Sequence, residues 1–279
     1  MHVPAAAGES LADFAIRMFP LILQADFVRY ATGAGLTFVA VEFVLRSWTK
    51  SRQIRDSRPG FPQIAREVLA SLRTIAIFAS FGLMIALGVM TGWIELAPEP
   101  QGWGWLWFGA NLALLLLAHD AWFYWTHRLM HRPRLFRWFH RLHHRSHNPT
   151  PFAAYAFDAS EAVVNAAFYP VALLVLPTSI SCALTFLFIM MTVNAIGHCG
   201  HEIYPARRDG TPLLDFFTTV THHDLHHAQA RWNFGFYFTH WDRWMGTEHP
   251  RYHEEFRRAV SQCRIGERAR ASGGSGPNA

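Results

Sequence analysis

Four long apolar stretches constrain the fold of this chain more than any other feature. They cover residues 27–48, 70–93, 103–125 and 162–196. An α-helix needs about 20 mainly apolar residues to cross the roughly 30 Å hydrocarbon core of a bilayer. The first three stretches therefore predict membrane-spanning helices. The fourth has Pro177 near its middle, so it predicts a hairpin of two helices that enters the bilayer either partly or completely.

The composition also indicates a membrane protein. Hydrophobic residues make up 51% of the 279 residues and charged residues only 16%, whereas about 25% of a soluble chain is charged. With this hydrophobicity, the net charge of +5 favours contact with an anionic membrane surface and not with nucleic acid. We expect an all-α, polytopic membrane protein with about four to five membrane-embedded helices and a helical cap.

The loop charges predict an orientation. The segment between the first two stretches is basic, with Arg46, Lys50, Arg52, Arg55, Arg58, Arg66 and Arg73. The next loop has Glu95 and Glu99 and no basic residue, and residues 127–147 are again rich in arginine. Basic loops stay on the cytoplasmic side. Three spans would place both basic segments on that side, so we expect the cap to be cytoplasmic.

Histidines are concentrated in and after the third apolar stretch, with 13 of the 17 between His119 and His227. They recur at intervals of three and four residues, which place side chains on one face of a helix. The pattern gives two pairs and two HxxHH triplets: His127 and His131; His198 and His201; His140, His143 and His144; and His223, His226 and His227. The first pair and the two triplets provide eight candidate metal ligands.

This many imidazoles exceed the needs of one metal ion. Imidazole suits zinc, copper, iron and nickel, and a zinc site uses about three or four protein ligands. Eight or more converging histidines therefore indicate two metal ions. The HExxH motif of metalloproteases is absent, and so are the Glu-x-x-His pairs of carboxylate-bridged di-iron bundles.

At these residues the sequence resembles the fatty acid hydroxylase / sterol desaturase superfamily of histidine-rich di-iron membrane oxygenases. The resemblance covers about residues 117–252. It lies in "HDAWFYWTHRLMH", "HRLHHRSHNPTPF", "NAIGHCGHEIYP" and "THHDLHHAQARWNFGFYFTHWDRWMGTEHP". The chain departs from the family in "YAFDASEA", where Asp158 and Ala159 replace a His-Pro pair that relatives often carry.

The resemblance implies two iron ions held by these eight histidines and by His198, which is the ninth candidate ligand. It also implies O2 as co-substrate and hydroxylation or desaturation of a lipid, either sterol-like or a fatty acyl chain. No dinucleotide fingerprint or cluster-binding cysteine run is present in the sequence, so electrons are expected from a separate donor protein. Two other functions remain open, a zinc-dependent membrane hydrolase and a metal transport or storage protein.

Several other residues have a weaker assignment. We expect a structural hydrogen bond at His119, and Asp120 and Asp224 are candidates to orient a liganding imidazole. His201 and His222 are candidates for metal contact. The residues expected to be structural are His147, His240, His249, His253 and the buried thiol of Cys199.

The sequence divides into three regions. Residues 1–110 are expected to form an N-terminal membrane region with two spans and the start of the third. Residues 111–255 are expected to form the catalytic domain that carries the histidine motifs. Residues 256–279 end in "ASGGSGPNA" and are expected to be a polar, flexible tail.

Overall fold

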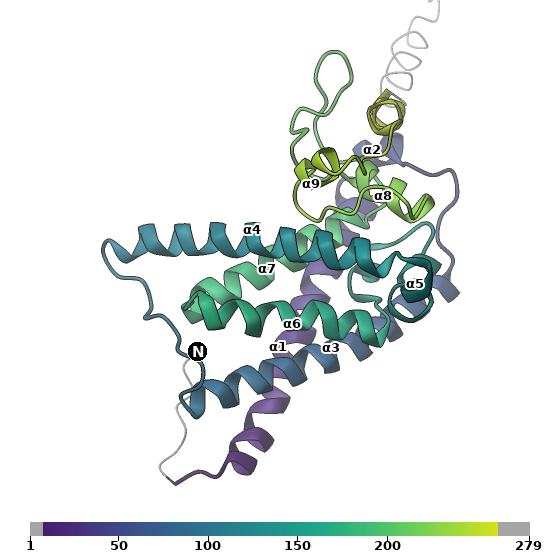
Figure 1. The fold of residues 1–279 in the computed structure, drawn as a ribbon. Helices are drawn as coiled ribbons and strands as arrows, with labels where there is room; N and C mark the ends of the chain where they lie inside the picture. The colour runs from purple at the N-terminus through teal and green to yellow at the C-terminus, as the bar shows by residue number, and fades with distance from the viewer. Residues whose placement is uncertain (1–7, 262–279) are drawn as a thin grey trace, which may run out of the picture.

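The protein is described here by a computed structural model in which residues 8–261 are placed. Helices and turns make up this part of the chain, which has isolated β-bridges but no strand. The long helices, all visible in Figure 1, are α1 (Leu11–Val39), α3 (Phe61–Met90), α4 (Gly104–Met130), α6 (Ala159–Val175) and α7 (Ile180–Gly197). The predicted all-α class is confirmed.

Three helices are long and apolar enough to span a membrane, namely α3, α4 and α7. The bent pair formed by 11–44 and 46–52, with an angle of 75°, gives a fourth candidate. Helix α6 is apolar but shorter. The fourth apolar stretch is the predicted hairpin, because α6 and α7 are separated by a break at 176–179.

The first helix begins earlier than the apolar stretch that predicts it. Helix α1 starts at Leu11, where the Ser10 side chain accepts a hydrogen bond from the backbone N–H of Asp13. Such a side-chain cap satisfies one of the unpaired N–H groups of the first turn. Hydropathy alone missed this first part of α1, because a cap and a charged first turn make it less apolar.

The long helices pack into one bundle. Helix α1 contacts α3 and α7, and α4 contacts α6 and α7. At Gly33 the helices α1 and α7 approach closely, because a Cβ atom there would lie 2.8 Å from Cγ of Met191. At the end of the bundle remote from the histidines, the Asn111 amide donates to the carbonyl of Pro177 at 2.9 Å and joins α4 to the α6–α7 turn.

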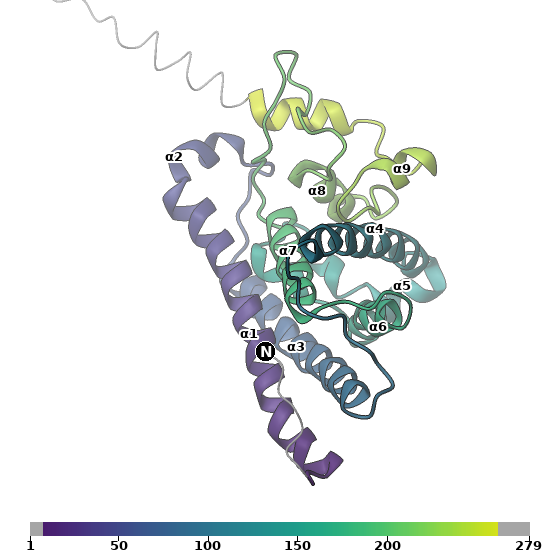
Figure 2. The same cartoon turned by 90° about the vertical axis from the view of Figure 1, so that its left-hand side faces the viewer.

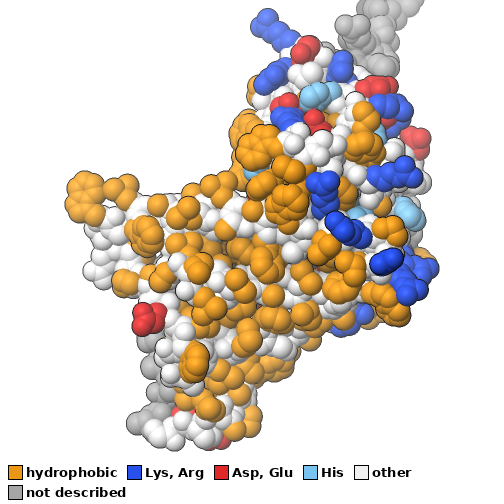
Figure 3. Space-filling model, viewed as in Figure 1, with side chains coloured by type: hydrophobic (Ala, Val, Ile, Leu, Met, Phe, Trp, Pro, Cys, Tyr) orange, Lys and Arg blue, Asp and Glu red, His pale blue; other side chains and the backbone are white. Residues whose placement is uncertain are grey.

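The short helices gather at the other end of the bundle (Figures 1 and 2). They are α2 (Arg46–Thr49), α5 (Pro133–Phe139), α8 (Val220–Ala228), α9 (His240–Trp244) and the 3₁₀ turns η2 (Lys50–Arg52), η3 (His143–Arg145) and η4 (Pro151–Tyr155). In Figure 3 the Lys and Arg side chains gather at this end, and hydrophobic side chains cover the bundle. We call this end the cap.

The two basic segments meet in the cap. Arg55 Nε, from the first basic loop, lies 2.9 Å from Oδ1 of Asp224 on α8. Arg132, Arg134 and Arg137 around α5 are exposed at the same end. The loop charges therefore predicted correctly that both segments share one end of the molecule.

The predicted polar tail begins with an ordered segment. Residues 252–261 are helical, and Phe256 is buried in a cluster with Leu225, Tyr252 and Val260. The first six residues of the expected tail are therefore packed against α8, because their apolar side chains recur at helical spacing. The remainder of the tail, 262–279, lies outside the described residues.

Candidate metal centre

All nine candidate histidines come together in the cap, in two groups. The first group contains His127, His131, His140, His144 and His226, and the second contains His143, His198, His223 and His227. Within each group the nearest ring nitrogens all lie within 4.8 Å of one another. Ligand nitrogens about 2.1 Å from a shared ion lie at most about 4.2 Å apart, so each group is close to the size of a single coordination sphere.

In the first group the Nε2 atoms converge. His127 Nε2 lies 2.9 Å from His140 Nε2. His144 Nε2 lies 3.2 Å from His131 Nε2 and 3.0 Å from His226 Nε2. Residues from α4, from the end of α5, from η3 and from α8 thus point at one small volume.

The second group has the same form. His198 Nε2, at the end of α7, lies 3.3 Å from His143 Nε2 and 3.1 Å from His223 Nε2. His227 Nε2 lies 3.2 Å from the Nε2 atoms of both His198 and His223. These four side chains come from α7, η3 and α8.

The two groups are neighbours. The ring centroids of His144 and His227 are 5.1 Å apart, and those of His140 and His143 are 5.0 Å apart. Each of these pairs joins a member of the first group to a member of the second. Two ions bound in these groups would therefore lie side by side.

Each HxxHH motif contributes to both groups. His140 and His144 belong to the first group and His143 to the second, while His226 belongs to the first and His223 and His227 to the second. The prediction that His140, His143 and His144 share one helix face is wrong, because α5 ends before His140 and the chain re-forms as the 3₁₀ turn η3. That change of helix type lets neighbouring residues diverge.

Backbone carbonyls fix the orientation of three rings. The Nδ1 atoms of His127, His198 and His226 lie 3.0, 2.7 and 2.7 Å from the carbonyl oxygens of Phe234, Asn194 and Trp232. A carbonyl only accepts, so Nδ1 of each ring carries the proton and donates. The lone pair of each ring is then on Nε2, which faces the group.

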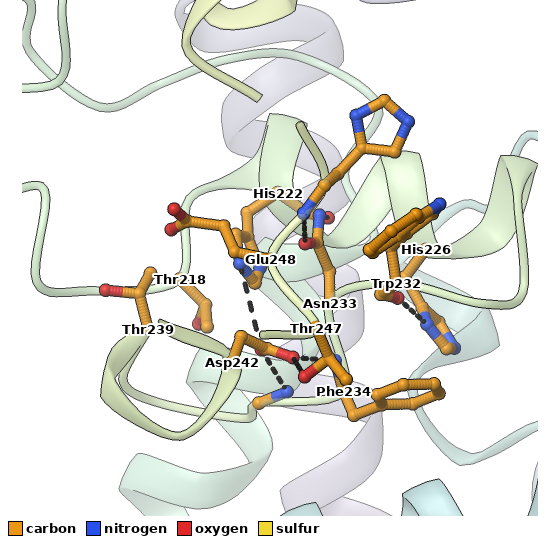
Figure 4. A network of polar contacts seen from close by, with 12 residues as sticks. Thr218, His222, His226, Trp232, Asn233, Phe234, Thr239, Asp242, Thr247 and Glu248 are labelled. Atoms are coloured by element: carbon orange, nitrogen blue, oxygen red, sulfur yellow. Dashed lines mark hydrogen bonds and ion pairs between the residues drawn. The ribbon is translucent and has the colours of Figure 1, made fainter. Parts of the chain in front are cut away.

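A buried network holds the loop that supplies two of these carbonyls (Figure 4). Asp242 Oδ1 and Oδ2 each accept a 2.8 Å hydrogen bond, from the N–H groups of Phe234 and Gly235. Asn233, with φ of 60°, donates to the carbonyl of His222 at 2.7 Å and accepts from the N–H of His249 at 2.7 Å. Loop 232–235 is therefore tied to both α8 and α9.

One carboxylate that contacts a candidate ligand, that of Glu161, is not among the residues predicted from the sequence. Glu161 Oε1 lies 2.7 Å from Nδ1 of His140, both side chains are buried, and the two atoms are in contact without the alignment of a hydrogen bond. Its neighbour Asp158, in the stretch that departs from the family pattern, accepts a 2.7 Å hydrogen bond from the N–H of Leu142. The signal available in the sequence was an acidic pair at the start of an apolar helix.

The two acidic residues proposed to orient a ligand have other partners. Asp120 Oδ1 accepts hydrogen bonds from the N–H groups of Tyr237 and Phe238 at 2.7 and 3.3 Å, and so holds the loop before α9. Asp224 pairs with Arg55. Neither contacts a histidine of the two groups in the described contacts, and the imidazole near Asp120 is that of His240, with Nε2 3.8 Å from Oδ2.

His119 does not make the expected hydrogen bond through Nδ1. That atom is buried and has no partner among the described residues. Instead the ring packs edge-on against Phe168 and Phe186, with centroids 4.9 and 5.4 Å apart. His119 lies about two turns before His127 on α4. At that depth its ring is surrounded by apolar side chains of the bundle interior.

The remaining histidines among residues 8–261 lie outside both groups. His201 Nδ1 is 2.9 Å from the carbonyl of Cys199, and His222 Nε2 is 3.8 Å from Asp242 Oδ2. Four others stand in structural or surface positions, namely His147, His240, His249 and His253. The thiol of Cys199 is buried, as expected.

Burial keeps the candidate ligands neutral. Loss of solvent lowers the pKa of His144 to about 3 and that of His198 to about 4. Burial and then the neighbouring imidazoles also lower the pKa well below its usual value at five further residues, His140, His143, His223, His226 and His227. Neutral imidazole is the form that binds a metal ion.

The residues fit bound metal ions. Nε2 lone pairs about 3 Å apart repel one another, and the carbonyls that hold Nδ1–H prevent the rings from exchanging their proton positions. A cation between the lone pairs removes this repulsion. The donor set of neutral nitrogens suits iron, zinc, copper or nickel.

An apolar cavity of about 570 Å³ lies inside the bundle next to these groups. Helices α1, α3, α4, α6 and α7 line it. Two of its lining rings contact the centre, since Phe123 lies 4.9 Å from His127 and Phe157 lies 5.5 Å from His143, measured between ring centroids. The cavity thus begins at these two rings, which separate it from the nine histidines, and extends into the apolar part of the bundle.

Several curated proteins are similar to this chain in sequence. The chain is 31% identical to a Delta(7)-sterol 5(6)-desaturase of Gibberella zeae, over 66% of this chain and 56% of that protein. It is 28% identical to another from Aspergillus fumigatus, over 66% of this chain and 62% of that protein. It is 27% identical to the lathosterol oxidase of Mus musculus, over 67% and 62% of the two chains. The chain thus spans 56% to 62% of the length of these relatives.

No solved structure matches the chain. Residues 112–247 match the family described as fatty acid hydroxylase. This range contains all nine histidines of the two groups. The match and the curated relatives assign residues 112–247 of this chain to the fatty acid hydroxylase / sterol desaturase superfamily.

Proposed function

We propose that this protein is an O2-dependent oxidoreductase that holds two iron ions and hydroxylates or desaturates a lipid. The observation that carries the proposal is the pair of adjoining histidine groups at the end of an apolar cavity. The names of the relatives, which are sterol desaturases and a lathosterol oxidase, support a lipid substrate.

In this proposal the nine histidines bind the two ions, five in the first group and four in the second. Bound iron with O2 supplies an oxidant strong enough for an unactivated C–H bond, which no side chain can provide. The carbonyls of Trp232, Phe234 and Asn194 hold three of the ligand rings in place. The Phe123 and Phe157 rings keep water from the cavity side of the centre.

The described residues suit a membrane-bound substrate. The cavity wall is mainly apolar, and three of the helices that form it, α3, α4 and α7, have the length and hydropathy of membrane spans. A lipid can therefore pass from the bilayer to the histidines without crossing water. Its apolar body would replace empty volume in the cavity, and its reacting carbon would lie beyond Phe123 or Phe157.

The proposed orientation places the cap in the cytoplasm. The exposed arginines of α5 and its flanks support it, because basic residues are retained on that side. They also form a positive surface over the metal centre, suited to a separate acidic electron-donor protein. Nothing in the described residues resembles a binding site for a redox cofactor of the chain's own.

The alternatives are a zinc-dependent hydrolase and a metal transport or storage protein. A catalytic zinc site needs about three protein ligands, so nine histidines in two groups exceed it. A transporter would carry ligands along its spans, whereas the two groups lie at one end of the bundle. Both observations favour the oxidoreductase.

The test combines metal analysis with lipid analysis. Purified full-length protein should contain about two irons per chain. Lipids from a host that expresses the chain should contain an oxidised product that is missing when His127 and His223 are replaced by alanine. One zinc per chain, or identical lipid profiles with and without intact histidines, would reject the proposal.

A further inference from the structure

The cavity contains one amide that the metal centre does not use. Asn165 on α6 lines the cavity, and its Oδ1 and Nδ2 are both buried without a hydrogen-bond partner among the described residues. The other cavity amide, Asn194, donates to the carbonyl of Ala154. A buried amide without a partner is costly, so two unpaired atoms on one side chain call for a ligand.

Asn165 lies at the histidine end of the cavity. On α6 it follows Glu161, which contacts His140, by one turn, or about 6 Å along the axis. The Trp122 indole donates to the carbonyl of Val164 at 3.3 Å, which places Asn165 beside the α4 turn that carries Phe123. Phe123 in turn contacts His127.

The rest of the cavity continues away from the histidines and is mainly apolar. Along α6 the lining passes from Asn165 through Phe168 to Leu173, and along α7 it reaches back to Ile180. Ile180 and His198 are separated by about 27 Å of helix. A long apolar body therefore fits beyond Asn165, with its far end close to the opposite side of the bundle.

The only ion pair that lines this cavity in the described part of the chain is neutral overall. Arg29 Nη2 lies 2.6 Å from Asp26 Oδ1, both on α1. A carboxylate or phosphate entering the cavity would find its charge uncompensated, because the nearby guanidinium is already paired. The cavity thus favours a polar group without charge.

We propose that Asn165 binds the hydroxyl group of a neutral lipid alcohol and so fixes which carbons reach the metal centre. An amide offers one acceptor and donors, and a hydroxyl offers both in return. The proposal rests on the proposed lipid oxidation and adds the substrate class and its orientation. The hydroxyl points to the histidine end, the oxidised carbon lies a few bonds from it, and the apolar tail lies toward Ile180.

Binding tests this without any turnover. Full-length, zinc-loaded protein in lipid nanodiscs without O2 is titrated with two pairs of probes, cholestanol with cholestane and octadecanol with octadecane. Cholestanol sulfate is the charged probe. We expect the wild type to prefer the alcohol in at least one pair and to bind the sulfate weakly.

Asn165→Leu should lower the affinity for the alcohol about tenfold, the effect of losing two neutral hydrogen bonds, and leave the hydrocarbon unaffected. Asn165→Ala should have the same effect. It replaces the leucine variant if that variant does not fold, and the metal content of each purified variant reports whether it has folded. Tyr169→Phe is the matched control, since the Tyr169 hydroxyl is also buried, unpartnered and in the cavity wall, one turn deeper. Tyr169→Phe should keep the wild-type preference for the alcohol over the hydrocarbon.

The proposal is overturned if the wild type shows no preference for an alcohol, if Asn165→Leu and Asn165→Ala keep it, or if Tyr169→Phe loses it. A parallel lipid-oxidation assay separates the two proposals. Alcohol binding through Asn165 without any oxidised product would reject the oxidoreductase function alone. Oxidation of lipids with no hydroxyl preference would reject the role of Asn165 alone.

Discussion

Oε1 of Glu161 lies 2.7 Å from Nδ1 of His140, and the two residues come from segments 21 positions apart that meet only in the folded cap. A carboxylate next to Nδ1 of a histidine holds the imidazole with Nε2 facing the metal and makes Nε2 a better ligand. Glu161 stands at the start of α6, so the same helix that lines the cavity also supports the metal centre.

We therefore predict that Glu161 sets metal affinity. Glu161→Ala should weaken binding at the first histidine group by about 10- to 100-fold. Glu161→Gln should lose less, because a polar side chain of the same shape still fills the space beside Nδ1 of His140. Competition with a chelator measures the affinity, and the exposed Glu254→Ala is the control. Equal affinity in Glu161→Ala and the control would contradict the prediction.

Asp242 should be essential for the stability of the cap. It accepts hydrogen bonds from the N–H groups of Phe234 and Gly235 and from the Thr247 hydroxyl, at 2.8 Å each. Asp242→Ala leaves these buried donors unpaired and should lower the free energy of unfolding by about 2–4 kcal/mol. Metal binding should weaken as well, because the loop holding the Phe234 carbonyl is released.

Thermal unfolding in detergent measures this change. Glu248→Ala is the matched control, since Glu248 is six residues further along and pairs with Arg243 near the surface. An exposed ion pair contributes about 0–1 kcal/mol, so the control should melt close to the wild type. If the two variants melt together, the network of Figure 4 does not stabilise the cap.

The stability of the metal-free protein should fall as the pH falls below about 6.5. Folding lowers the pKa of His144 to about 3 and of His198 to about 4 through burial, whereas an unfolded histidine titrates near 6.5. Between these values the unfolded state binds protons that the folded state does not. Each such histidine therefore lowers the free energy of unfolding by up to about 1.4 kcal/mol for each unit by which the pH falls.

Melting of the metal-free protein at about pH 7 and about pH 5 tests this. The melting temperature should be clearly lower at the acidic value, and replacement of His144 by phenylalanine should reduce the difference. Bound metal should increase the pH dependence further, because protons compete with the ion for Nε2. A melting temperature independent of pH would show that the histidines are not buried in the folded state.

The sequence predicted the elements that rest on local pattern. Apolar length predicted α3, α4 and α7, Pro177 predicted the break between α6 and α7, and the loop charges predicted which segments share the cap. Histidine spacing selected eight of the nine residues that converge, and the family resemblance selected His198. Each of these inferences uses neighbours in the chain, for which helix geometry and hydropathy are sufficient.

What the sequence could not predict depends on long-range contacts. The partner of His140 is Glu161, and no spacing rule relates them. Asp120 and Asp224 lie beside histidines in the sequence, but the fold directs them to the Tyr237 amide and to Arg55. The division of each HxxHH motif between two groups follows from the 3₁₀ turn at 143–145 and from where α8 packs, and both are set by tertiary structure.

His226 and His227 are adjacent residues of α8 that belong to different histidine groups. His226 belongs to the first group, with Nε2 3.0 Å from His144 Nε2, and His227 belongs to the second, with Nε2 3.2 Å from His198 Nε2. Neighbours on a helix point about 100° apart, so one short helix serves both groups. Replacing either by alanine should therefore weaken one site and spare the other.

Full-length protein loaded with iron under anaerobic conditions should hold about two ions, and each single variant about one. The double variant should hold almost none, while His253→Ala, on the same end of the protein but outside both groups, should hold about two. Metal analysis after gel filtration measures these values. If His226→Ala and His227→Ala each lose both ions, the histidines form one inseparable cluster, because removal of a ligand from one group then empties the other.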